Sequence, residues 1–303
     1  MKAFIKFFFL PIVLVILFTF TSFSAPRPGF YIPEPIEEVS FRYKMANNLI
    51  VLPVTINDSI NINLILDTGC RNLVLFGKRF QKLLNFDPKK VVQFSGLGSG
   101  SAVVGKLSLH NKVSIDQVIG EEIPIVVIEK RNLFQTFDQV HGVIGYDIFT
   151  KFEVEINPST QMITFRPAAS ATLSSEFQQV PIRVEDSRPL IDCRVVFTKD
   201  KTHICDLMID TGSALGLLLK TTDIDQYSYN GRRALLGRGL NGEIHGLVTT
   251  TEKLIVSNFE MKNLSTGIIQ SPWHNYASIG MDVLKDYSIV LNYCKGYAGF
   301  KKV

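Results

Sequence analysis

The chain has 303 residues, of which 46% are hydrophobic and 20% charged, a composition typical of a folded globular protein and not of a disordered one. The formal net charge of +4 is small and no block of lysine and arginine stands out, so nucleic acid is not an expected partner. Four scattered cysteines without a C-x-x-C pair exclude a disulfide-dense scaffold. They also give no zinc motif, so we expect neither a metal nor another cofactor.

The N-terminus has the composition of a secretory signal. Lys2 and Lys6 precede an apolar run over residues 7–20, and small residues follow up to Ala25. This pattern predicts a signal peptide over residues 1–24. The alternative is an uncleaved membrane anchor, but the run is short for a spanning helix and contains Pro11. We therefore expect an exported protein, periplasmic or secreted in a Gram-negative bacterium, with no stable membrane insertion after cleavage.

Beyond a Pro-rich lead-in at residues 25–40, the sequence runs through one series of signals and then repeats it. The first copy spans 41–167 and the second 176–303, joined by an Ala/Ser-rich linker at 168–175. The first copy begins with a predicted hairpin, 49–56 and 60–66, that ends in Asp67-Thr68-Gly69-Cys70. In the second, the predicted hairpin of 190–197 and 202–209 ends in Asp210-Thr211-Gly212-Ser213.

Each copy continues with a glycine-rich stretch, 94–100 or 236–242, between apolar segments. Near its end, each copy has an isoleucine followed by a glycine, within residues 143–145 or 278–280. One predicted helical turn follows, which Asp147 or Asp282 is placed to cap. Strand and turn patterns account for the rest. The sequence therefore predicts two all-β lobes of about 130 residues each.

A repeated aspartate at the end of an apolar strand suggests a specific chemistry. Two carboxylates held about 3 Å apart cannot both ionise, so they share one proton. The ionised carboxylate can deprotonate a bound water while the protonated one donates to a carbonyl oxygen, which hydrolyses an amide without a covalent intermediate. A single Asp-Thr-Gly could be a β-turn with a solvated carboxylate. Two copies, each at the end of an apolar strand and each followed by a glycine-rich stretch, argue against that interpretation. The glycine-rich stretches are long enough to cover a substrate.

These motifs resemble those of the retropepsin-like bacterial aspartyl proteases, in the clan of pepsins and retropepsins, over nearly the whole mature chain. The resemblance implies two tandem β-barrel lobes that form a pseudo-dimer within one chain, with Asp67 and Asp210 as the catalytic pair at the interface. Thr68 and Thr211 would brace the two loops, and Ser213 would hydrogen-bond Asp210. The implied supporting residues are Thr68, Gly69, Thr211, Gly212 and Ser213, and the flap residues Gly96, Gly98, Gly100, Gly237, Gly239 and Gly242. Pepsins carry a flap tyrosine, and neither glycine-rich stretch has one.

The sequence thus predicts a monomeric aspartic-type endopeptidase that acts on a peptide or protein substrate. The alternative is an exported peptide-binding or assembly module with the same fold and no turnover. The sequence contains no motif of the other hydrolase classes, neither H-E-x-x-H nor Gly-x-Ser-x-Gly, and His141 and His245 are interpreted as structural. Cys193 and Cys205 flank a polar turn and are expected either to form one disulfide or to stay as buried thiols.

Overall fold

The computed structural model describes residues 28–94, 98, 100–129, 139–198, 201–227, 231–271 and 277–303. The expected signal peptide at residues 1–24 lies outside the described residues, as does Gly96. In the part of the chain that is described, no helix is long and apolar enough to cross a membrane.

The first copy folds into a β-barrel. Among the described residues, six of its strands close into a ring in the order β4-β5-β10-β6-β9-β8, because β8 pairs with both β9 and β4. Strands β1, β3 and β7 add to the edges of this ring. The bounds are β1 (Gly29–Tyr31), β3 (Lys44–Ala46), β4 (Leu49–Ile56), β5 (Ile60–Leu66), β6 (Leu73–Phe76), β7 (Phe86–Phe94), β8 (Val103–Ile115), β9 (Val118–Ile128) and β10 (Gly142–Ile144).

The second copy repeats this ring strand for strand. Its order is β15-β16-β21-β17-β20-β19, closed by the pairing of β15 with β19, with β14 and β18 at the edges. The prediction of an all-β fold with two barrel-like lobes is confirmed. The bounds are β14 (Arg183–Glu185), β15 (Arg188–Thr198), β16 (Lys201–Asp210), β17 (Leu217–Thr221), β18 (Arg232–Gly239), β19 (Gly242–Val256), β20 (Phe259–Gln270) and β21 (Ala277–Gly280).

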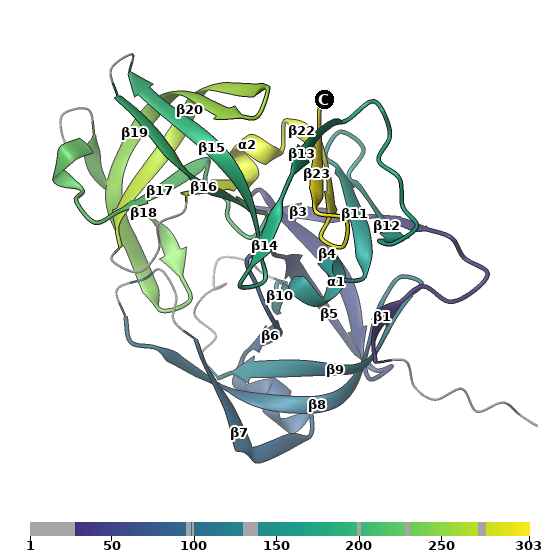
Figure 1. Ribbon diagram of the computed structural model, residues 1–303. Helices are drawn as coiled ribbons and strands as arrows, with labels where there is room; N and C mark the ends of the chain where they lie inside the picture. The colour runs from purple at the N-terminus through teal and green to yellow at the C-terminus, as the bar shows by residue number, and fades with distance from the viewer. Residues whose placement is uncertain are drawn as a thin grey trace, which may run out of the picture.

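In the described part of the chain, a third sheet takes three strands from each half of the chain, in the order β13-β23-β22-β11-β12-β2. The copies meet where β11 pairs with β22, with Glu155 opposite Val290 at the centre of the pairing. In Figure 1 the second barrel lies at the upper left, the first runs below it, and the shared sheet lies at the upper right. The bounds are β2 (Val39–Arg42), β11 (Phe152–Asn157), β12 (Met162–Pro167), β13 (Gln178–Pro181), β22 (Tyr287–Asn292) and β23 (Tyr297–Lys302).

The buried faces of these strands follow from the sequence pattern. In β5, Ile62, Leu64 and Leu66 are buried while Asn61 is exposed, so one face of the strand packs into the core and the other reaches solvent. One continuous apolar core runs through both barrels and the shared sheet. Two smaller apolar clusters lie outside it, one in each barrel. The lead-in supplies β1 and the first two residues of β2, and its treatment as a separate segment stays a prediction.

The predicted helical turns are α1 (Tyr146–Phe149) and α2 (Met281–Leu284), but the prediction that Asp147 and Asp282 cap them is wrong. The N-cap residues are Gly145 and Gly280, and neither helix has a side-chain cap. The first helical amides instead donate to the Asp-Thr-Gly loops: Tyr146 N–H to Cys70 O at 2.9 Å, and Met281 N–H to Ser213 O at 2.8 Å. Backbone carbonyls of a neighbouring loop thus satisfy the donors that a capping side chain would take.

Cys193 and Cys205 are direct partners across the β15–β16 hairpin. Both are free thiols, and their sulfur atoms lie 3.6 Å apart. Cys193 is buried and Cys205 packs against the main core. The pair therefore contributes to the core as thiols.

Candidate active site

The two Asp-Thr-Gly loops meet between the barrels through a reciprocal set of hydrogen bonds. Thr68 Oγ1 donates to Ile209 O at 2.6 Å and accepts from Thr211 N–H at 3.0 Å. Thr211 Oγ1 donates to Leu66 O at 2.8 Å and accepts from Thr68 N–H at 3.1 Å. Both threonines are fully buried. Each side chain thus spans the interface to satisfy backbone groups of the other loop, and we call this set the threonine brace.

The brace brings the carboxyl groups of Asp67 and Asp210 to one place. A methyl group added at Gly69 would lie 3.1 Å from Asp67 Oδ1 and 3.8 Å from Asp210 Oδ1. At Gly212 an added methyl would lie 2.2 Å from Asp67 Cγ, so the carboxyl group of one loop packs directly on the glycine of the other. Each aspartate also accepts a hydrogen bond from the glycine of its own loop, at 2.7 Å for Gly69 and 3.2 Å for Gly212. Only glycine at these positions allows so close an approach.

The surroundings of the pair favour protonation. Burial raises the pKa of Asp67 to about 6, against the opposing effects of the Gly69 N–H and Arg188. Burial, and then the charge of Asp67, raise the pKa of Asp210 to about 7. Lys220, the Gly212 N–H and Arg188 act in the other direction on Asp210. The pair can therefore hold a single proton near neutral pH, as the shared-proton chemistry requires.

The glycine-rich stretches approach each other across the two barrels. Asn241, at the tip of the β18–β19 hairpin, accepts from Gly98 N–H at 2.7 Å and donates through Nδ2 to Gly100 O at 2.8 Å. A methyl group at Gly98 would come within 2.6 Å of the Gly242 backbone, and one at Gly100 within 2.0 Å of Asn241 O. The neighbouring Leu240 packs against the smaller apolar cluster of the first barrel. Hydrogen bonds between the Asn241 side chain and the backbone of Gly98 and Gly100 thus join the two tips.

The remaining predicted residues have mixed surroundings. Gly239 pairs with Gly242 at the hairpin tip, whereas Gly237 lies further back at a register shift, with open space where a side chain would be. The hydrogen bond that Ser213 Oγ makes is with Leu215 N–H at 3.3 Å, and not the one to Asp210 that the resemblance implied. At the matching place in the first loop, Cys70 Sγ donates to Asn72 O at 2.9 Å.

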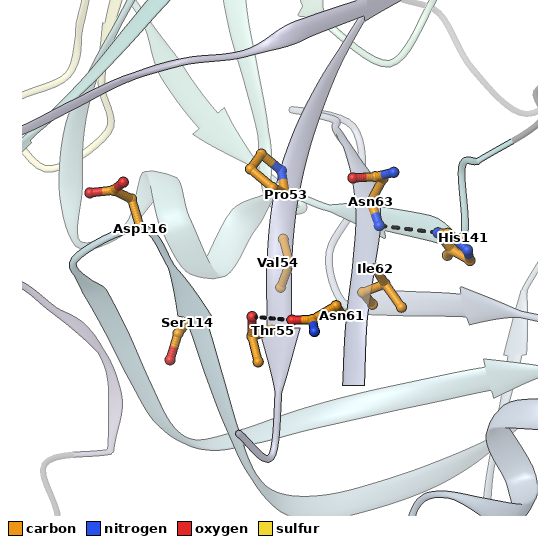
Figure 2. A pocket seen from close by; sticks show the side chains of 9 residues that line it. All are labelled: Pro53, Val54, Thr55, Asn61, Ile62, Asn63, Ser114, Asp116 and His141. Carbon is orange, nitrogen blue, oxygen red and sulfur yellow. Dashed lines mark hydrogen bonds between the residues drawn. The ribbon is translucent and has the colours of Figure 1, made fainter. Parts of the chain in front are cut away.

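Two surface cavities lie apart from the aspartate pair. The larger, of about 460 Å³, opens against the β4–β5 hairpin, where His141 Nδ1 accepts from Asn63 N–H at 3.1 Å (Figure 2). The other, of about 400 Å³, lies on the second barrel and includes His245. Neither is lined by a residue of the Asp-Thr-Gly loops. Within the described ranges, no group of three or more His, Cys, Asp or Glu side chains is placed to hold a metal ion.

Sequence reasoning missed three residues: Lys220 and Arg188, which act on the aspartate pair, and Asn241, which joins the glycine-rich tips. Asn241 was inside a predicted flap, but only its glycine neighbours were singled out. Both cations exert an electrostatic effect on Asp210. A comparison of the two copies by strand register would have detected the two cations, because each stands where the first copy has an apolar residue.

The comparison with protein families supports the first half of this site. Residues 52–148 match the family model described as aspartyl protease. This segment begins in β4, contains Asp67-Thr68-Gly69 and ends within α1. A search of curated proteins found no match to the chain. The family match indicates aspartic peptidase activity in general.

Proposed function

We propose that the protein is an aspartic-type endopeptidase that hydrolyses peptide bonds with a water molecule activated between Asp67 and Asp210. The observation that carries the proposal is the threonine brace, which holds two carboxyl groups from two equivalent loops around one point. The raised pKa values of both groups and the bridge between the two glycine-rich tips support it.

The chemistry follows from one proton shared by two acids. The ionised carboxylate accepts a proton from water as the water oxygen forms a bond to the scissile carbonyl carbon. The protonated carboxyl group donates to the carbonyl oxygen, which gives a tetrahedral diol. The C–N bond then breaks as the amide nitrogen takes a proton from the protonated carboxyl group, while one hydroxyl group of the diol gives its proton to the ionised carboxylate, so the pair again holds a single proton. With the two pKa values near 6 and 7, activity should be bell-shaped and highest close to neutral pH.

One chain supplies both aspartates in this proposal, so the enzyme acts as a monomer. It is exported, and its partner is a peptide or protein substrate. The apolar residues 7–20 and the basic residues before them support export.

Cleavage of a mixed peptide library, with and without pepstatin, tests the activity. Asp67→Asn and Asp210→Asn should each lower kcat by several orders of magnitude while the protein stays folded, because the two residues act as a unit. An equal mixture of the two variants should recover no activity, whereas a site shared between two chains would recover roughly a quarter. Peptide binding without cleavage by the wild-type protein would replace the proposal with the non-catalytic binding module.

A further inference from the structure

The equivalence of the two barrels allows the surroundings of each aspartate to be compared by strand register. In the first barrel Val51 pairs with Ile65, so the same register continued by two residues brings Leu49 opposite Asp67. In the second barrel Leu190 pairs with Met208, which brings Arg188 opposite Asp210. Leu49 is a buried member of the core, whereas Arg188 carries a positive charge. The two half-sites thus differ beside their aspartates.

A second position differs in the same way. Val143 pairs with Val74 in the first barrel, and the equivalent Ser278 pairs with Leu218 in the second. Two residues further along each strand lie Phe76 and Lys220. Phe76 is buried in the smaller apolar cluster of its barrel. Lys220 therefore stands where the first barrel has a buried aromatic ring.

The strand pattern shows which face Lys220 is on. In β17, Leu217 and Leu219 belong to the main core, while Leu218 belongs to the smaller cluster beneath the β18–β19 hairpin. Lys220 lies two residues beyond Leu218 and therefore on the same face of the strand. Its register partner, Ile269, belongs to that same smaller cluster. Lys220 thus extends from the wall of the barrel that the second glycine-rich hairpin covers.

The two cations influence each other and the aspartate. Lys220 interacts electrostatically with both Asp210 and Arg188. Burial, with Arg188 adding to it, lowers the pKa of Lys220 to about 8, so its ammonium group is only partly hydrated but still charged at neutral pH. Arg188 is fixed by an ion pair with Asp186, which Arg71 of the first barrel also contacts at 3.5 Å. Arg188 acts on both aspartates, whereas Lys220 lowers the pKa of Asp210 and has no such effect on Asp67, so the two half-sites differ through Lys220.

We propose that Lys220 is a specificity-determining residue that binds an acidic side chain of the peptide substrate on one side of the scissile bond, with Arg188 adding positive potential behind it. The proposal rests on the proposed peptidase function. A peptide that crosses the interface presents residues on opposite sides of the scissile bond to opposite barrels. The Phe76 side then takes an apolar residue. An ammonium group and a carboxylate form a charge-assisted hydrogen bond, which is about twice as strong as a neutral one.

The test uses one cleavable library peptide and its variants with Glu or Gln at each position around the cleaved bond. For the wild-type protein, kcat/KM should be about tenfold higher for Glu than for Gln at one position, on one side only. Lys220→Met should bring this ratio close to one, and Lys220→Arg should retain it. Lys262→Met is the matched control, because Lys262 is an exposed β20 lysine paired with Glu260, and its ratio should equal that of the wild type. Phe76→Lys should create a second preference for Glu on the other side of the bond.

The outcomes separate this proposal from the peptidase proposal. Cleavage with a Glu-to-Gln ratio near one at every position overturns the acidic subsite and leaves the peptidase. A preference that survives in folded Lys220→Met also overturns it. If no peptide is cleaved, fluorescence anisotropy of the same peptides decides. Tighter binding of a Glu peptide that depends on Lys220 supports the subsite and overturns the peptidase, while equal binding of Glu and Gln peptides overturns both.

Discussion

Replacement of Thr68 by valine should strongly destabilise the protein, because the threonine hydroxyl serves two buried backbone groups of the other loop. The change removes the acceptor of Thr211 N–H and the donor to Ile209 O while keeping the shape of the side chain. A buried backbone group left without a partner costs about 1–3 kcal/mol, so two such groups cost about 2–6 kcal/mol. That is a large fraction of the total stability of a typical domain, about 5–15 kcal/mol.

The assay is urea unfolding of Thr68→Val beside Thr68→Ser, which keeps the hydroxyl and loses one methyl group worth about 0.8 kcal/mol. Thr211→Val should cost as much as Thr68→Val, because the brace is reciprocal. The double variant should cost less than the sum of the two, since both side chains hold the same interface. If the free energies of unfolding of the valine and serine variants agree within about 0.5 kcal/mol, the brace contributes nothing and the reasoning is refuted.

Three further predictions concern pH, the tips and the glycines. The folded pKa values of Asp67 and Asp210, about 6 and 7, lie above the ordinary 3.8, so the folded state binds more protons and this contribution to stability is lost as pH rises from about 4 through 7. Thermal melts across that range should show a shallower fall for Asp210→Asn, and parallel curves would contradict it. Asn241→Ala should raise KM, because it weakens the bridge between the tips. The weaker bridge should also give faster hydrogen exchange in the tip of the first barrel, and unchanged exchange would exclude the bridge. Gly212→Ala should abolish activity, because the added methyl group would collide with Asp67. Gly237→Ala should leave the protein stable, because the space around Gly237 is open. Equal activity of the two variants would refute the packing argument.

The strands next to the site could be predicted from sequence because their signals are local. The predicted hairpin of 49–56 and 60–66 has the bounds of β4 and β5, since an apolar run in the first strand, alternation in the second and the polar turn between them define both strands. The helix caps failed for the opposite reason. Asp147 and Asp282 fit a local capping rule, but carbonyl groups distant in sequence took the helical amides.

The residues around the aspartate pair were harder to predict, because their roles depend on register. The second copy has one more residue between its aspartate and the following strand, so Lys220 does not align with Phe76 by counting from the motif. Only the pairing of both strands with β10 and β21 reveals the equivalence. The bridge made by Asn241 likewise joins two loops whose proximity no local pattern encodes.

The shared sheet also determines what the first half of the chain can associate with. Glu155 and Val290 face each other at the centre of the β11–β22 pairing, and each lies ten residues beyond the closing glycine of its own copy. A first half produced alone would have β11 as an open edge, and pairing with an identical partner would bring two Glu155 carboxylates face to face. Like charges directly opposite each other destabilise a strand pair. The replacement of one glutamate by Val290 therefore favours association of the first half with its own second half over self-association.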